Sequence, residues 1–372
     1  MASSIDRLLA YQIAARHFPG AVVHVERAGK VLAHQAAGVL RPDSEAAMHD
    51  AAIFRLASLS KPVVSVAALM QVGEGLLALD APAADYLPVL DGLRMQSGVR
   101  PDRAPTVRDL MRHNSGLVYE WDIRDAELRR IALRSDFLGR MPCVAPEAFL
   151  AALAALPLAT QPGTNFRYGY STDILGMIVE KLDGMPLGQS LKARIFDRLG
   201  MADTGFEVPA CERPRLAAAH ATDVAWQERV KGYGLRLEGQ PWMQSGGGGL
   251  VSTLGDYARF ARMLANRGCS GGERLIAEAL FHEMSSNQLP DDAEGPSAYT
   301  GPGFGFGLGL AVRLDWGPAA MPCVAGEMTW SGISGTALFV HPGEQWFAIS
   351  FTSNLATRMM ARMEFRRAAS LL

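Results

Sequence analysis

Lysine and cysteine are scarce in this chain. Only five of the 36 basic residues are lysine, at positions 30, 61, 181, 192 and 231. The four cysteines have none of the paired spacing that a zinc site requires, and they stand at positions 143, 211, 269 and 323. We therefore interpret the cysteines as free thiols and expect neither a metal nor another cofactor.

Net charge and long apolar runs are also lacking. The formal charge of −2 at pH 7 gives no electrostatic case for binding nucleic acid or an anionic membrane. No segment approaches the roughly 18 continuous apolar residues of a membrane span. Asp6, Arg7 and Arg16 interrupt what would be the apolar region of a signal peptide. These absences favour a cytoplasmic enzyme whose partner is a small molecule.

The order of strand-like and helical segments predicts the fold class. Domains usually contain about 100–200 residues, so 372 residues suggest two structural units. β-Rich runs flank Ala28-Gly29 and recur near the C-terminus, whereas the long middle has helical spacing. We expect an α+β fold with an antiparallel sheet flanked by helices and an inserted, mainly helical domain. The predicted sheet domain comprises 1–75 and 226–372, the helical domain comprises 76–225, and the active site lies in the cleft between them.

Ser58 and Lys61 form the one S-x-x-K motif of the chain, in "FRLASLSKPVVSV". Residues three apart share one face of a helix, so the two side chains can touch if a helix begins near Ser58. An amine can activate a serine hydroxyl only when the amine is itself uncharged. Burial among apolar neighbours and the exposed N–H groups of a helix start both disfavour the ammonium form. A lysine-activated nucleophile is one interpretation of this motif, and a chance surface pair is the other.

The motif order along most of the chain resembles the serine β-lactamase-like, penicillin-binding superfamily. The closest likeness is to its class C β-lactamase and family VIII carboxylesterase branch. The matching segments, in order, are "FPGAVVHVERAGKVL", "FRLASLSKPVVSVAALMQVGEGLLALDAPAADYLP", "TVRDLMRHNSGL", "PGTNFRYGYSTDILGMIVEKLDG", "GGGLVSTLGDYARFARML" and "WSGISGTALFVHPGEQWFAISF".

The resemblance implies a role for several residues. Ser58 resembles the acylated nucleophile, Lys61 its proton acceptor, and Tyr168, five residues before Asp173, the tyrosine that shares the acid–base work. Trp330, Ser331 and Gly332 stand where the family has its third motif, usually K-T-G, and are expected to contact substrate. The backbone amides of Ser58 and Ile333 would then form the oxyanion hole.

Two departures from the family pattern bear on the substrate. Trp330 replaces the cation that β-lactamases and peptidases use for a substrate carboxylate, and tryptophan offers an apolar wall instead. Tyr170 stands where many relatives have asparagine, and it could face the site in place of Tyr168. Both departures favour a carboxylesterase acting on small or short-chain esters. The alternatives are a β-lactamase or D-amino-acid peptidase, an acyltransferase to an alcohol acceptor, and an acylated, non-enzymatic sensor.

Two further features resemble catalytic groups of other enzymes. The segment Gly268–Gly272 matches the G-x-S-x-G nucleophile elbow, but a helical run precedes it where the elbow needs a strand. We therefore expect a surface turn there. His113 has no task in a serine–lysine–tyrosine scheme and is expected to be structural.

Overall fold

The computed structural model describes residues 3–120, 144–220 and 243–372, together with 123, 126, 129, 130 and 223. The predicted domain boundary at 225/226, Cys143 and Lys231 lie outside the described residues. Most of the 119–145 segment lies outside them as well.

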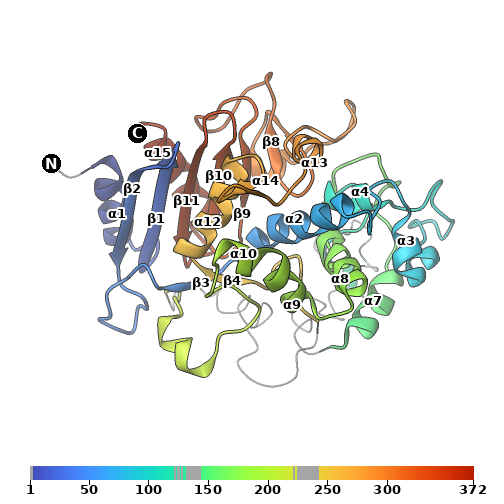
Figure 1. The fold of residues 1–372 in the computed structure, drawn as a ribbon, viewed down its shortest axis with the longest axis horizontal. Helices are drawn as coiled ribbons and strands as arrows, with labels where there is room; N and C mark the ends of the chain where they lie inside the picture. The colour runs from blue at the N-terminus through green and yellow to red at the C-terminus, as the bar shows by residue number, and fades with distance from the viewer. Residues whose placement is uncertain are drawn as a thin grey trace.

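A seven-stranded antiparallel sheet forms one side of the molecule, with the strand order β2-β1-β11-β10-β9-β8-β7 (Figure 1). The strands are β1 (Gly20–Arg27), β2 (Lys30–Gly38), β7 (Phe304–Phe306), β8 (Ala311–Arg313), β9 (Met328–Ser331), β10 (Ala337–His341) and β11 (Trp346–Thr352). The N-terminal strand β1 pairs with the C-terminal strand β11, with Ala21 opposite Thr352. The predicted fold class is therefore confirmed.

The predicted hairpin between β1 and β2 turns at Ala28 and Gly29. Both residues have positive φ, 49° and 77°, which is the conformation that a two-residue hairpin turn of matching twist requires. Glycine adopts it without strain, and it is uncommon for alanine.

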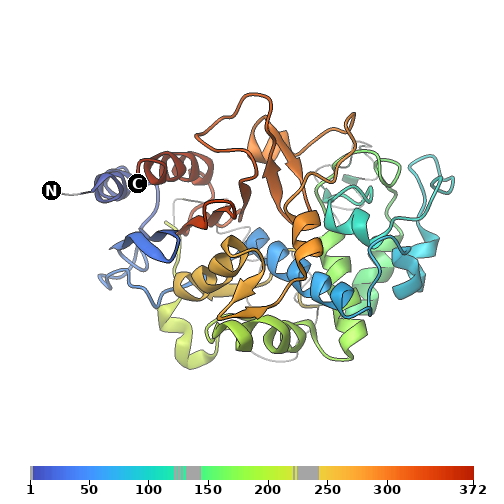
Figure 2. The ribbon, with the colours of Figure 1, turned by 45° about the horizontal axis from the view of Figure 1, so that its top comes forward.

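Helices cover both faces of the sheet. On one face, α1 (Ser4–Ala14) and α15 (Arg358–Ala369) lie side by side, as Figure 2 shows. Ile5, Leu9 and Phe365 from these helices join one apolar cluster with inward-facing residues of β1, β10 and β11. The other face is covered by α12 (Leu254–Ala265), which contacts β1, β10 and β11.

The described middle of the chain is mainly helical. Its longest helix, α8 (Ser171–Asp183), packs against α2 (Ser60–Gly73), which runs between the sheet and the helical part (Figure 1). The other described helices of this part are α3 (Ala83–Tyr86), α4 (Val107–Met111), α7 (Pro146–Ala154), α9 (Leu187–Leu191) and α10 (Asp197–Leu199). Two further helices, α13 (Glu278–Met284) and α14 (Ser297–Thr300), lie in the C-terminal part of the chain. A π-helical turn, η5 (Lys192–Phe196), and the 3-10 turns η1 (Ala57–Leu59), η2 (Pro88–Gly92) and η6 (Ala210–Arg215) complete the helical elements among the described residues. The division into two domains at the predicted boundaries stays a prediction.

Two short hairpin-like sheets lie outside the main sheet. In one, β3 (Ile53–Arg55) pairs with β4 (Val251–Thr253) directly before the Ser58 turn. In the other, β5 (Cys269–Ser270) pairs with β6 (Glu273–Arg274) around two exposed glycines. The Gly268–Gly272 segment is thus the surface turn we predicted, with no nucleophile elbow.

The start of α2 differs from the prediction. The α-helix begins at Ser60, and Ser58 lies in the preceding 3-10 turn η1. Ala57 has a φ of 47°, an unfavourable conformation for alanine that costs on the order of 1–3 kcal/mol and persists only where the surroundings impose it. This tight turn joins β3 to α2 and separates Ser58 from the regular helix.

Candidate active site

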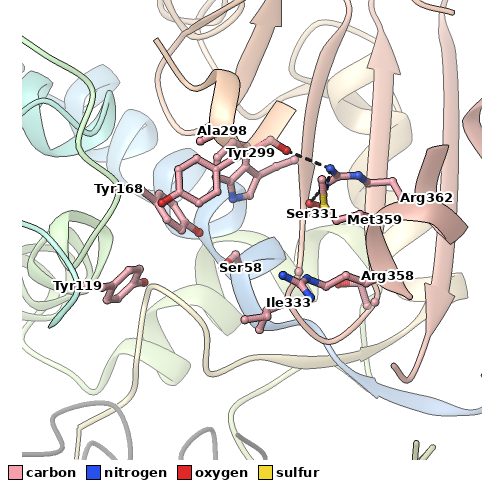
Figure 3. A pocket seen from close by; sticks show the side chains of 14 residues that line it. Ser58, Tyr119, Tyr168, Ala298, Tyr299, Ser331, Ile333, Arg358, Met359 and Arg362 are labelled. Carbon is pink, nitrogen blue, oxygen red and sulfur yellow. Dashed lines mark hydrogen bonds between the residues drawn. The ribbon is translucent and has the colours of Figure 1, made fainter. Parts of the chain in front are cut away.

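Ser58 lines a pocket of about 320 Å³ (Figure 3). Tyr119 and Tyr168 come to it from the helical side, and β9 with the loop after it forms a second wall. The third wall comes from α14 and α15. The Ser58 hydroxyl therefore lies where these three walls meet and can contact a small ligand in the pocket.

Lys61 lies behind Ser58, fully buried at the start of α2. Its Nζ is 3.4 Å from Ser58 Oγ. The amine also donates to the Tyr119 hydroxyl at 3.1 Å and to the Gly247 carbonyl at 2.6 Å. Burial lowers the pKa of Lys61 to about 7, although the negative charge of Asp173 acts in the opposite direction. A substantial fraction of Lys61 is therefore uncharged at neutral pH and can accept the serine proton.

The negative charge of Asp173 acts on Lys61, but the hydrogen bonds that Asp173 accepts come from other groups. Its Oδ1 accepts from Ser245 Oγ at 2.6 Å and from the Gly247 amide at 3.0 Å. Burial raises the pKa of Asp173, while Lys61 and these two donors lower it. One oxygen of this carboxylate thus accepts from neutral donors, and Lys61 forms no ion pair with the residues that the structure describes.

The glycine run at 246–249 makes this arrangement sterically feasible. A Cβ on Gly247 would lie 2.5 Å from Asp173 Oδ2, and one on Gly246 would lie 2.6 Å from the Thr172 carbonyl oxygen. Only glycine lets the backbone approach Asp173 on one side and Lys61 on the other. The chain forms a turn at these glycines.

Tyr168 faces both Ser58 and Lys61. Lys61 Nζ lies 4.6 Å from the centroid of the Tyr168 ring, and the phenol lines the pocket. Burial raises the pKa of the Tyr168 hydroxyl above its ordinary value, whereas the adjacent Ser58 hydroxyl and Trp330 indole lower it. The phenol therefore carries its proton at neutral pH and can donate it.

His113 supports Tyr168 from behind. The centroids of the two rings are 4.9 Å apart, and His113 Nε2 lies 3.4 Å from Thr172 Oγ1. Burial lowers the pKa of His113 well below its ordinary value, so the ring is neutral. His113 does not line the pocket, in keeping with the structural role we expected for it.

Trp330, Ser331, Gly332 and Ile333 all line the pocket, and their contact with substrate stays a prediction. A Cβ on Gly332 would lie 2.3 Å from the Leu56 carbonyl oxygen, so this strand can approach the Ser58 turn only with glycine there. The following loop is tied to the same turn by two hydrogen bonds, from Ser334 Oγ to the Arg55 carbonyl at 2.6 Å and from Thr336 Oγ1 to the Leu56 carbonyl at 2.9 Å. The backbone around Ile333 is thereby held beside Ser58.

Tyr170 does not contact the pocket, contrary to our expectation of a substrate-binding residue. Its side chain is fully buried, and its hydroxyl donates to Glu120 Oε1 at 2.6 Å. Tyr168 and Tyr170 are separated by one residue just before α8, and the backbone there directs only Tyr168 towards Ser58.

Tyr119 and Asp173 were not predicted as parts of the site. Tyr119 lies in an irregular segment, 61 residues after Ser58 in the sequence, and no local sequence pattern indicates a role for it. Asp173 occurs in "YGYSTD", where its fixed distance from Tyr168 was the available signal.

Comparison with known proteins places the chain. The model of the Beta-lactamase family matches residues 5–372. This chain belongs to the β-lactamase family. The resemblance seen in the motifs is therefore confirmed, and the family supports an enzyme of the serine hydrolase type.

Three proteins illustrate what this member of the β-lactamase family is similar to. Protein Rv1367c of Mycobacterium tuberculosis is 34% identical over 335 residues, which cover 85% of this chain and 81% of that protein. Esterase EstB of Burkholderia gladioli is 31% identical over 362 residues, covering 91% and 87%. The solved structure of EstCE1, a hydrolase with promiscuous acyltransferase activity, has a TM-score of 0.82 at 26% identity and covers 98% of this chain and 97% of its own.

Two kinds of feature are absent from the described part of this β-lactamase-family member. No helix there has the length and apolar character needed to cross a membrane. Among the same residues, no group of three or more histidine, cysteine, aspartate or glutamate side chains is arranged to hold a metal ion.

Proposed function

We propose that this protein is a carboxylesterase that hydrolyses small or short-chain esters through an acyl-enzyme on Ser58. One observation carries the proposal. A buried lysine with a pKa of about 7 lies 3.4 Å from the hydroxyl of a serine that faces a pocket. Such an amine can take the serine proton, which an ordinary lysine cannot do at neutral pH.

Acylation follows from these positions. Ser58 Oγ attacks the ester carbonyl carbon while its proton passes to Lys61 Nζ. The backbone amides of Ser58 and Ile333 stabilise the negative charge on the former carbonyl oxygen. Tyr168 donates its phenolic proton to the departing alkoxide as the C–O bond breaks, and Lys61 returns a proton to the phenolate. The alcohol leaves, and Ser58 carries the acyl group.

Deacylation uses the same groups in reverse. A water molecule attacks the acyl carbon, and its proton passes to the Tyr168–Lys61 pair. The tetrahedral intermediate then collapses, the carboxylic acid is released, and Ser58 recovers its proton. Every step needs a base that is neutral at rest, which is why the low pKa of Lys61 is central.

The third motif supports an ester rather than a β-lactam. Trp330 presents an indole at the third motif, where it provides apolar contact and no positive charge. Tyr170 is turned away and cannot take the place of the asparagine found there in many relatives. The relative named as an esterase, EstB, agrees with this preference.

Acyl transfer to an alcohol is the second candidate. It uses the same acyl-enzyme and differs only in the second nucleophile. The similarity to EstCE1, a hydrolase with promiscuous acyltransferase activity, supports acyl transfer as the second candidate. Product analysis in the presence of added short-chain alcohols separates the two, because transfer yields a new ester and hydrolysis yields acid.

The test combines labelling with turnover. A fluorophosphonate is expected to modify Ser58, as read by peptide mass spectrometry, and a short-chain chromogenic ester is expected to turn over faster than a chromogenic cephalosporin. Ser58→Ala should lose both labelling and ester turnover. Ser270→Ala, in the surface turn, is the matched control and should keep both. Labelling of another serine, or ester turnover that survives Ser58→Ala, would refute the proposal.

The cytoplasmic location also belongs to this proposal. Fractionation of cells that express the full-length protein checks it, and recovery of the protein outside the cytoplasm would contradict it.

A further inference from the structure

The turn that carries Ser58 is held from both sides by groups that the ester mechanism does not use. Before Ser58, the carbonyls of Arg55 and Leu56 accept from two hydroxyls of the loop after β9. After Ser58, the Leu59 carbonyl accepts from the Tyr257 hydroxyl at 2.8 Å. Tyr257 belongs to α12 and is not among the described residues that line the pocket. Its contact with the turn is therefore separate from any contact with substrate.

The turn needs such support because Ala57 has an unfavourable backbone conformation. Its φ of 47° lies in the left-handed region, which a residue with a Cβ rarely adopts unless its surroundings impose it. Ala57 directly precedes Ser58, so relaxation of the alanine would rotate the peptide that carries the Ser58 amide. That amide is an expected oxyanion-hole donor, and such donors stabilise a transition state when they are already aimed at the oxygen. Relaxation of the turn would therefore lower activity without unfolding the protein.

Tyr257 can oppose this relaxation because its own position is fixed. Its ring is fully buried and contacts Phe351 of β11, with the two centroids 5.7 Å apart. α12 is itself held to β1 by two hydrogen bonds from Arg262 to Glu26, at 2.7 and 2.6 Å. Burial raises the pKa of the Tyr257 hydroxyl well above its ordinary value, so the phenol keeps its proton and donates it to the carbonyl. Through this hydrogen bond, a helix packed on the sheet restrains the Ser58 turn.

We propose that Tyr257 is a positioning residue of the esterase, whose hydroxyl holds the strained turn in the conformation that aligns the Ser58 hydroxyl and amide for acylation. This inference rests on the proposed function and adds a residue outside the pocket. Without the hydrogen bond, the turn would exchange between the strained conformer and a relaxed, inactive one. Strain at Ala57 favours the relaxed conformer, whereas the Tyr257 hydroxyl favours the strained one. The effects of the two residues on activity should therefore be coupled.

The test is a double-mutant cycle between Tyr257→Phe and Ala57→Gly. Tyr257→Phe deletes only the hydroxyl, and Ala57→Gly removes the Cβ that makes a positive φ unfavourable. Two rates are measured for each variant: the second-order rate of Ser58 labelling by a fluorophosphonate, and kcat/KM for a neutral short-chain chromogenic ester. The final stoichiometry of labelling is measured as well, because an unfolded fraction lowers the stoichiometry whereas a misaligned turn lowers only the rate.

In the wild-type background, Tyr257→Phe should slow both rates about fivefold, the effect of one neutral hydrogen bond, with full labelling at long times. In the Ala57→Gly background, the same change should slow them by less than about twofold, because glycine adopts positive φ without strain. The pH midpoint of kcat/KM should not move, since Lys61 keeps its surroundings. Tyr86→Phe is the matched control. The Tyr86 hydroxyl, in α3, accepts from the Ala78 amide at 2.9 Å, and its removal should leave both rates unchanged.

The outcomes separate this inference from the proposed function. Ser58-dependent labelling and turnover that Tyr257→Phe slows by less than about twofold overturn the positioning role and leave the esterase standing. A larger loss that Ala57→Gly does not reduce also overturns it, because the two positions are then independent. The same holds for a loss that takes the form of incomplete labelling, which indicates partial unfolding. Absence of Ser58-dependent labelling and turnover in the wild type overturns both.

Discussion

Lys61 and Arg366 are two buried cations with opposite surroundings. The Glu327 carboxylate binds Arg366 through both of its oxygens, and the guanidinium lies 4.6 Å from the centroid of the Trp346 ring. Lys61 instead donates to a phenol and a backbone carbonyl, both of them neutral. The Asp173 carboxylate that could pair with it accepts from Ser245 and Gly247.

This difference separates a structural cation from one that can change its charge. A buried cation with a bound carboxylate keeps its proton, because losing the proton would leave a buried, unpaired anion. Burial disfavours the charged form of a cation that no bound carboxylate stabilises, so the pKa of Lys61 falls to about 7 although the charge of Asp173 acts in the opposite direction. Arg362 lies between the two cases, since arginine cannot deprotonate near neutrality and no carboxylate among the described residues forms an ion pair with it.

The largest loss of activity is expected when Lys61 is replaced by a permanent cation. Lys61→Arg keeps a positive charge that cannot be lost, so we expect kcat/KM for a neutral ester to fall at least about 1,000-fold. Lys61→Met, uncharged but unable to accept a proton, should be equally inactive. Lys30→Arg, in the exposed β1–β2 hairpin, is the control and should behave as wild type. Activity in Lys61→Arg within about tenfold of wild type would rule out the neutral-amine mechanism.

The opposite change removes the counterion from Arg366. Glu327→Gln leaves a buried arginine without a carboxylate, and we expect the free energy of unfolding to drop by about 3 kcal/mol. Chemical denaturation measures it. Replacing both partners, as Glu327→Leu with Arg366→Met, should restore much of the loss because no unpaired charge remains. A single variant as stable as wild type would show that the pair contributes little.

A smaller effect is expected when Lys61 loses one of its neutral acceptors. Tyr119→Phe removes the hydroxyl that accepts from Lys61 Nζ at 3.1 Å. Since one such hydrogen bond contributes about 1 kcal/mol, kcat/KM should fall about five- to tenfold. Tyr11→Phe, on exposed α1, provides the control for the same chemical change. A loss of more than about 100-fold would instead indicate that Tyr119 takes part in proton transfer.

The smallest expected effect is a shift along the pH axis. Because the pKa of Lys61 is about 7, kcat/KM for a neutral ester should rise as the pH increases through that value and level off above it. Asp173→Asn removes the negative charge that raises the pKa of Lys61, so the midpoint of the rise should move to lower pH. Asp315→Asn, at an exposed site, should leave the midpoint unchanged. A midpoint that moves upward in Asp173→Asn would contradict the assigned electrostatics.

The amino-acid sequence by itself determined the local features of this protein. The spacing of Ser58 and Lys61, the Ala28-Gly29 turn and the apolar character of α2 depend on neighbouring residues, and the structure contains each of them. The order of the motifs also identified the family, and hence the fold, because those motifs span the whole chain. The predicted start of α2 near Ser58 was wrong by two residues, since the strained Ala57 turn is imposed by packing rather than by local preference.

Only the tertiary structure decided which groups act on the serine–lysine pair. Lys61 meets a carbonyl 186 residues away and a phenol 58 residues away, and its pKa depends on that enclosure. The choice of Tyr168 over Tyr170, and the arrival of Arg362 beside Ser331, depend equally on elements that are distant in sequence. The physical reason is that burial and the placement of counterions are properties of the packed chain, and no local spacing encodes them.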